Sequence, residues 1–258
     1  PARPGAAREA CAWAYRALDG PVFFEFALSK SGDTPEKRLK DYQGNLQTDG
    51  ASNFGKAPQK KGVVHLLCWA HARRYFDKAC KAGEKAAEPF MEGMRGIFRL
   101  EKLIRIHKLD TEKAQAAREN YSLPEAEKLF AAALLWRENS PMHKTAMGRA
   151  VDYFLKRKEE LLECFRQPGS RIDNNLVENA IRPLKLGLKN YLFVGHPAAG
   201  STFACLYTLV ENCRLAGANP EEYLADVIER LLDHPSSRLE EFIPQNWVEL
   251  RKSKNVGQ

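Results

Sequence analysis

Glu178 is the one carboxylate in a stretch of amide and cationic side chains, residues 174–185. The apolar residues of this stretch recur at the spacing of one helical face, and they are Leu176, Val177, Ala180, Ile181 and Leu184. The other side is polar and carries Asn174, Glu178, Arg182 and Lys185, with Asn175 and Asn179 at its edge. A solvated surface helix usually carries several acids and lysines. One carboxylate on a basic, amide-rich face therefore suits a metal ligand that faces an anionic substrate.

The end residues of this helix predict its bounds. Asp173 or Asn174 can cap its start, because both have side-chain oxygens that accept backbone N–H groups. Pro183 disfavours an α conformation for the residue before it, so the helix is predicted to stop at Arg182.

Asp49 is a second candidate acid, at the end of a predicted strand. Sheets of α/β proteins expose functional side chains at the C-terminal ends of their strands. An Asp-Gly pair is also common in turns, and for Asp49 alone a plain turn residue is the favoured interpretation. Together with Glu178 it forms a carboxylate pair suited to Mg²⁺ or Mn²⁺, which prefer oxygen ligands. Two such ions about 3.5–4 Å apart can activate a nucleophile and stabilise a leaving oxygen in phosphodiester chemistry.

Cys68 and His71 have the residue types of half a zinc site. No second pair has matching spacing, so structural zinc is the less favoured hypothesis. In the alternative, residues 68–71 form a strand-to-helix junction where Trp69 packs and His71 faces a substrate with Arg73 and Arg74. A helix-capping role for His71 and a functional one remain open at this point.

Basic residues accompany both acids along the sequence, and they are Lys56, Lys60, Lys61, Arg73, Arg74, Arg182, Lys185 and Lys189. Such side chains can contact phosphates without reading a base sequence, and binding of that kind depends on salt. An ordinary solvated face is the alternative. The run Lys156-Arg157-Lys158 is interpreted as solvated helix rather than as a DNA contact.

The composition is that of a globular protein with a basic balance. The 258 residues are 44% hydrophobic, and 40 Lys and Arg outnumber 33 Asp and Glu, for a net charge of +7. That charge is compatible with nucleic acid without demonstrating it. No apolar run is long enough to span a bilayer, and six scattered cysteines predict reduced, mostly buried thiols in a cytosolic protein. Because the first residue is Pro1, we expect a fragment or a processed product.

The elements that must position the two acids alternate between strands and helices. Two strands, 11–18 and 21–28, are expected as a hairpin around Asp19-Gly20. A short helix over 34–42, a strand over 46–48, a strand over 63–68 and a helix over 70–81 follow. Residues 82–166 have helical spacing throughout, with breaks near residues 122–124 and 140–141. Two more helices are predicted, one over 202–215 that stops at Gly217 and one that begins at Asn219.

Several motifs occur together in one order: LQTDG at 46–50, CWAHARR at 68–74, DNN at 173–175 with Glu178 and Arg182-Pro183, KNYLF at 189–193 and NPEEYL at 219–224. Together they resemble the bacterial transposases of insertion-sequence family sixty-six, the TnpC type. The resemblance covers nearly the whole chain.

The resemblance implies an α/β fold: an RNase H-like core with an Asp-Asp-Glu triad, a helical insertion before the Glu, and a C-terminal helical region. The expected parts are 1–81 and 167–200 for the core, 82–166 for the insertion and 201–258 for the C-terminal region. Asp49 would be the second acid and Glu178 the third, with Mg²⁺ or Mn²⁺ as cofactor. Cys68, His71 and Asn175 would support the site, and Arg73, Arg74, Arg182, Lys185 and Lys189 would bind DNA.

The first acid has no match in these residues. An RNase H-like core places three antiparallel strands before its first helix, and only two are predicted here. We therefore expect the first strand and its Asp upstream of Pro1, and little activity from the fragment alone. Asp19, in the hairpin turn, is a poor substitute. Ala51 and Phe54 stand where the family usually has aromatic residues around Asp49-Gly50, and Ala51 departs from that pattern.

The implied partners are transposon ends and target DNA, a second copy of the chain on DNA, and accessory transposition proteins, in the bacterial cytoplasm at the nucleoid and away from membranes. Two other hypotheses remain: a catalytically inactive DNA-binding or assembly module, such as a decayed transposase, and a helical structural protein whose charge is only solvated surface.

Overall fold

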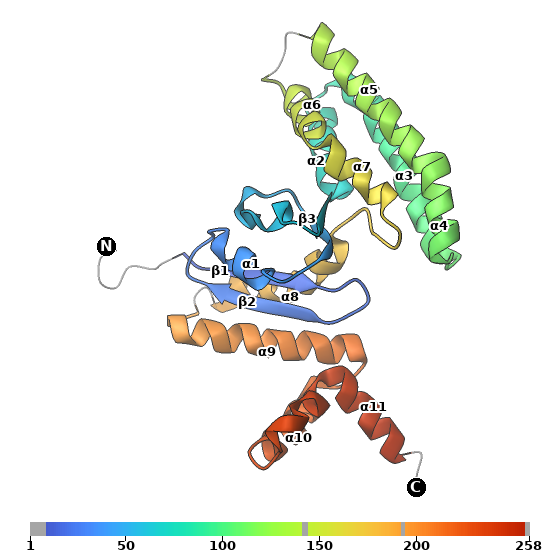
Figure 1. Cartoon of the computed structure of the whole chain (residues 1–258). Coiled ribbons are helices and arrows are strands. Elements are labelled where there is room, and N and C mark those ends of the chain that lie inside the picture. Colours follow the sequence, from blue (N-terminus) through green and yellow to red (C-terminus); the bar gives the residue numbers. More distant parts are fainter. Residues whose placement is uncertain (1–8, 141–143, 192–193, 256–258) are drawn as a thin grey trace, which may run out of the picture. The chain divides into compact units, whose positions relative to one another are not determined.

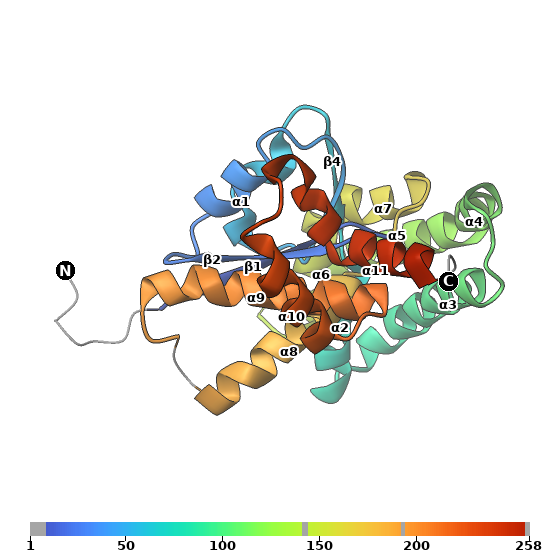
Figure 2. The same cartoon turned by 90° about the horizontal axis from the view of Figure 1, so that it is seen from below.

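The computed structural model describes residues 9–140, 144–191 and 194–255. The fold is mixed α/β and mostly helical, and the described residues form two sheets of two strands each (Figures 1 and 2). The chain divides into two compact units. We call residues 31–174 the continuous unit, and residues 1–30 together with 175–258 the discontinuous unit.

The sheet of the continuous unit is parallel. Strand β3 (Gly44–Thr48) pairs with β4 (Val63–Leu67) in a register that runs from Gly44 opposite Val63 to Thr48 opposite Leu67. Helix α1 (Asp33–Arg38) precedes this sheet, and the turns η1 (Ser52–Phe54) and η2 (Ala57–Gln59) connect its strands. Both predicted strands are confirmed. Helix α1 is shorter than the helix predicted over 34–42, and it ends at Arg38.

Helices make up the rest of the continuous unit: α2 (Trp69–Lys81), η3 (Lys85–Ala87), α3 (Glu88–Ile106), α4 (Thr111–Ala117), η4 (Arg118–Ser122), α5 (Leu123–Asn139), α6 (Ala146–Lys156) and α7 (Lys158–Arg166). All of them except α4 and η4 contribute to one core with β4. Trp69 lies at its centre with a fully buried side chain, and its ring contacts Phe130, Phe154 and Phe165. The indole Nε1 donates to the Leu161 carbonyl over 2.9 Å, so the polar edge of this buried ring is also satisfied.

The predicted break near residues 122–124 is wrong. Helix α4, the π-helical turn η4 and helix α5 follow one another without an intervening loop. Pro124 stands in the first turn of α5, where a missing N–H costs least, and the π turn before it shifts the hydrogen-bond register. Helix α5 does end at Asn139, as the second predicted break requires, whereas Pro141 lies outside the described residues.

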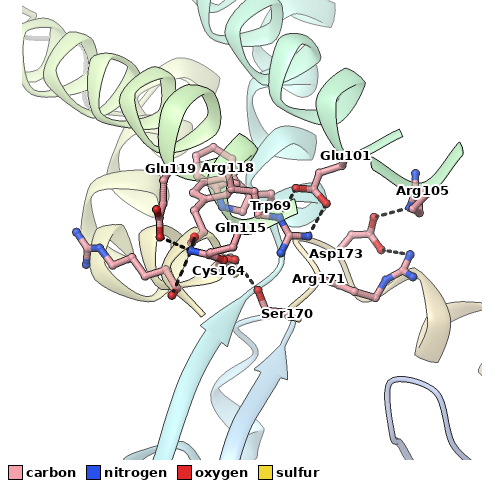
Figure 3. A network of polar contacts seen from close by, with 12 residues as sticks. Trp69, Glu101, Arg105, Gln115, Arg118, Glu119, Cys164, Ser170, Arg171 and Asp173 are labelled. Atoms are coloured by element: carbon pink, nitrogen blue, oxygen red, sulfur yellow. Dashed lines mark hydrogen bonds and ion pairs between the residues drawn. The ribbon is translucent and has the colours of Figure 1, made fainter. Parts of the chain in front are cut away.

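A buried ion pair joins helix α3 to the π turn. Arg118 donates from Nε and Nη2 to the two carboxylate oxygens of Glu101, over 2.7 and 2.8 Å (Figure 3). Both side chains are less than a tenth exposed. This bidentate geometry offsets the free-energy cost of removing both charged groups from water.

The discontinuous unit contains the second sheet, and here the strands are antiparallel. Strand β1 (Cys11–Arg16) pairs with β2 (Val22–Ala27), from Cys11 opposite Ala27 to Arg16 opposite Val22, so the hairpin around Asp19-Gly20 is confirmed. Its helices are α8 (Asn175–Tyr191), α9 (Pro197–Ala216), α10 (Pro220–Leu231), η5 (Ser236–Phe242) and α11 (Pro244–Asn255).

Helix α9 lies along β2 (Figure 1). The Asn212 side chain accepts from the Val22 amide over 3.0 Å and donates to the Val22 carbonyl over 2.7 Å. One amide therefore satisfies both backbone groups at the start of the strand. Helix α9 begins at Pro197, earlier than predicted, because His196 caps it by accepting the Ala198 amide. It ends at Gly217 with a left-handed φ of 72°, as predicted.

Helix α8 corrects a second prediction, because it runs through Pro183 to Tyr191 instead of stopping at Arg182. Proline removes the hydrogen bond to the carbonyl of Asn179, and Asn179 is exposed, so water can replace that bond. On the other side of the helix, Ala180 and Leu184 are buried against the β1–β2 hairpin. Packing on both sides of the proline thus keeps the helix continuous.

Candidate active site

Asp49 stands directly after β3, half-buried, in a turn whose shape depends on the next two residues. Its Oδ1 accepts the Ala51 amide over 2.9 Å, which orients the carboxylate. Gly50 has a φ of +81°, a backbone conformation that residues other than glycine rarely adopt. A carboxylate has two oxygens with about four lone-pair sites, so one hydrogen bond leaves room for a cation.

Thr48 and His65 hold the same turn from inside the sheet. Thr48 Oγ1 accepts the Gly50 amide over 3.2 Å and lies 2.9 Å from His65 Nε2. Burial lowers the pKa of His65; Glu160 opposes this effect and Arg157 adds to it. An unprotonated His65 Nε2 can accept a hydrogen bond from the Thr48 hydroxyl.

Two side chains from the end of helix α6 lie against this turn. The Tyr153 hydroxyl donates to the Asp49 carbonyl, and Arg157 Nη2 donates to the Gly50 carbonyl, both over 3.3 Å. The interpretation of Arg157 as part of a solvated helix is therefore wrong for this residue, which is half-buried over the Tyr153 ring. The available signal in the sequence was an aromatic residue and an arginine four apart, which places both on one helical face.

Cys68 and His71 lie at the start of helix α2, with different surroundings. Cys68 is fully buried, its Sγ accepts the Asn174 amide over 3.3 Å, and burial raises the pKa of its thiol. His71 Nε2 lies 2.9 Å from Arg74 Nη1. Within the described residues, no three His, Cys, Asp or Glu side chains group as metal ligands would. Cys68 thus acts as a hydrogen-bond acceptor that ties two chain segments together.

The segment that leads to helix α8 is bonded to the end of the parallel sheet. The Trp69 amide donates to the Ile172 carbonyl over 2.8 Å, and Gln47 Nε2 donates to the Arg171 carbonyl over 2.7 Å. The buried Asp173 carboxylate lies between two arginines, 3.7 Å from Arg171 and 4.0 Å from Arg105 (Figure 3). Sequence reasoning assigned no partner to these arginines. Whether Asp173 or Asn174 caps α8 stays a prediction.

Glu178 lies in the first turn of α8 and is half-buried. Of the other polar residues expected on this helix, Asn174 is half-buried and precedes its first residue; the exposed ones are Asn175, Asn179, Arg182, Lys185 and Lys189. The apolar stripe is confirmed where it packs, because Ala180 and Leu184 contact the buried Val22 and Phe24 side of the hairpin. The predicted buried face of this helix is therefore present, although the helix is longer than predicted.

The predicted site residues fall into two groups. Asp49, Cys68, His71, Arg73 and Arg74 belong to the continuous unit, and both arginines are exposed on α2. Glu178 and the residues of helix α8 belong to the discontinuous unit. Each group has a carboxylate able to ligate a hard cation and exposed cations able to contact phosphate.

Comparison with known families identifies the family of the chain. The model of the family described as Transposase IS66 family matches residues 2–202, and the IS66 C-terminal element matches residues 208–245. The chain belongs to the IS66 transposase family. The resemblance inferred from the motifs is thereby confirmed.

The IS66 chain is also similar to proteins of Sinorhizobium fredii (strain NBRC 101917 / NGR234). The uncharacterized protein y4jD is 31% identical over 92% of this chain and 47% of its own length. The uncharacterized protein y4qI is 31% identical over 94% of this chain and 48% of its own length. The chain thus spans about half the length of these curated relatives. No solved structure matches it. Among the described residues, no helix is both long and apolar enough to cross a membrane.

Proposed function

We propose that this IS66 family chain is part of the catalytic domain of an Asp-Asp-Glu transposase that cleaves DNA and transfers its strands. The observation that carries the proposal is the placement of Asp49 directly after a parallel strand, in a turn whose backbone is held by the side chains of Thr48, Tyr153 and Arg157. Family membership supports the class of reaction.

The order of elements supports an RNase H-like core. A hairpin, a short helix and a parallel strand pair precede the helical segment of residues 82–166, and the Glu178 helix follows it. In this proposal, the first strand of the core and the first acid of the triad lie outside these 258 residues. The proposed core comprises residues 1–81 and 167–200, the insertion residues 82–166 and the C-terminal region residues 201–258.

Asp49 and Glu178 would hold Mg²⁺ or Mn²⁺, and both residues have the oxygen donors that these ions prefer. When bound, the ions supply activation of the attacking oxygen and stabilisation of the leaving oxygen. Arg73, Arg74, Arg182, Lys185 and Lys189 position phosphates, since all five are exposed cations. The Asp49 turn keeps its carboxylate oriented before DNA binds.

The proposed partners are transposon ends and target DNA, a second copy of the chain on DNA, and accessory transposition proteins, in the bacterial cytoplasm at the nucleoid. Binding to phosphates by five cations predicts a steep dependence on salt.

The direct test uses the complete transposase, with the segment that precedes Pro1, on DNA that carries the terminal repeats. Asp49→Asn and Glu178→Gln should each abolish Mg²⁺-dependent cleavage while DNA binding at low salt persists. Asp19→Asn is the matched control, because Asp19 is an exposed residue of the hairpin turn. Full cleavage by Glu178→Gln would refute the assignment.

A second candidate is an inactive DNA-binding or assembly module. Ala51, exposed beside Asp49 where the family usually has an aromatic residue, favours it. This candidate predicts salt-dependent DNA binding that is indifferent to Mg²⁺, and no cleavage by the complete protein.

A further inference from the structure

The Asp49-Gly50 turn lies beyond the last hydrogen bond of its sheet. Strand β3 ends at Thr48, whose carbonyl accepts the Cys68 amide over 3.1 Å. The next two carbonyls, of Asp49 and Gly50, accept side-chain donors, Tyr153 and Arg157. The two peptide groups that follow Asp49 and Gly50 are therefore held by side chains about a hundred residues later in the chain, and the first of them borders the Asp49 Cα.

These two donors are themselves held in a stack. The Tyr153 ring is stacked on Tyr75 of helix α2, with centroids 4.3 Å apart and 21° between the planes. On Tyr153 lies the Arg157 guanidinium, 4.1 Å from the ring centroid. Arg157 is the residue that follows α6, so its backbone is set by the end of that helix. Stacking restricts both side chains to the orientation in which they reach the turn.

Gly50 shows how closely the stack approaches the turn. A Cβ at this position would lie 3.0 Å from the Tyr153 hydroxyl and 3.2 Å from Arg157 Nε. A side chain at this position would crowd both donors and would be strained at a φ of +81°, so glycine lets the stack approach the turn closely.

We propose that Tyr153 and Arg157 are positioning residues for Asp49, and that the helical segment orients the metal-binding carboxylate through them. The inference rests on the proposed function of Asp49 as a metal ligand. Residues that orient a ligand typically change metal affinity by about 10- to 100-fold when they are replaced. The helical segment would then be part of the site rather than a spacer between two acids.

The variants that test this keep most of the packing and either remove the hydrogen bond or take away the geometry that directs it. Tyr153→Phe retains the stacked ring, and Arg157→Lys retains the charge without the planar fork. Tyr121→Phe is the control, since Tyr121 is an exposed tyrosine of the same helical segment. The first readout needs no metal: amide hydrogen exchange at Ala51, which donates to Asp49 Oδ1, should become at least several-fold faster in both variants and stay unchanged in the control.

The second readout is Mn²⁺ affinity of the complete transposase, measured by calorimetry together with thermal stability. We expect Mn²⁺ binding about 10- to 100-fold weaker in Tyr153→Phe and Arg157→Lys, at a melting temperature close to that of the parent. If both variants keep the parent affinity while Asp49→Asn loses it, the positioning role is wrong and the proposed function stands. If Asp49→Asn also keeps the parent affinity, both proposals are overturned.

Discussion

Replacing Glu101 by glutamine should test how much the buried ion pair stabilises the fold. The change keeps the shape of the side chain but removes its charge, which leaves the Arg118 guanidinium buried without a counter-charge. The two side chains are 8% and 6% exposed, so water cannot take over the role of the carboxylate. Breaking a buried pair on one side typically costs about 3–5 kcal/mol of unfolding free energy. For a chain of this size, that corresponds to a melting temperature lower by roughly 6–20 °C.

The assay is urea and thermal unfolding of the 258-residue chain, followed by circular dichroism. Asp77→Asn is the matched control, because Asp77 pairs with Lys81 on the surface of α2 and its loss should cost about 0.5 kcal/mol or less. The double variant Glu101→Leu with Arg118→Met should recover most of the stability, since it removes both charges and fills the space. A loss below about 1 kcal/mol for Glu101→Gln would refute the reasoning, because it would mean that the arginine is compensated without its partner.

Three further predictions follow from buried groups. Trp69→Phe should lower the unfolding free energy by about 2–4 kcal/mol in urea titrations, because it opens a void and removes the indole N–H that donates to the Leu161 carbonyl. An unchanged unfolding free energy would mean that the site repacks. Burial lowers the pKa of His65, so the His65 imidazole binds a proton at higher pH in the unfolded chain than in the folded one. The free energy of unfolding should therefore fall as the pH drops below about 6.5, and His65→Gln should flatten this dependence. Alkylation followed by mass spectrometry should label exposed Cys205 and spare buried Cys68, whose thiol pKa burial raises; equal rates would contradict this.

The elements that sequence analysis predicted well are those with local signals. Asp19-Gly20 marks the hairpin, Gly217 ends helix α9, and the apolar spacing of residues 176–184 defines the buried face of α8. Each signal acts over a few residues, through turn conformation or helical periodicity, so no distant contact is needed to interpret it. The same locality explains why the residue order of the IS66 motifs was sufficient to identify the family.

The errors at prolines have one physical cause. Proline lacks the N–H that a continuing helix uses, so a local rule predicts a break at both Pro183 and Pro124. In the fold, burial of Ala180 and Leu184 carries α8 across the first, and a π turn with the Glu101–Arg118 pair lies directly before the second. Packing contributes more than the single hydrogen bond that is lost, and packing partners are set by tertiary structure.

Residue types alone determined that Asp49 and Glu178 are carboxylates at a strand end and on a basic helix, because composition and periodicity are local properties. Only the tertiary structure decided what surrounds Asp49. Tyr153 and Arg157 reach its turn from 104 and 107 residues away, and Tyr75 supports them from another helix. Contacts at such separations depend on how helices pack over the sheet, and that packing is a property of the whole core around Trp69 rather than of any segment.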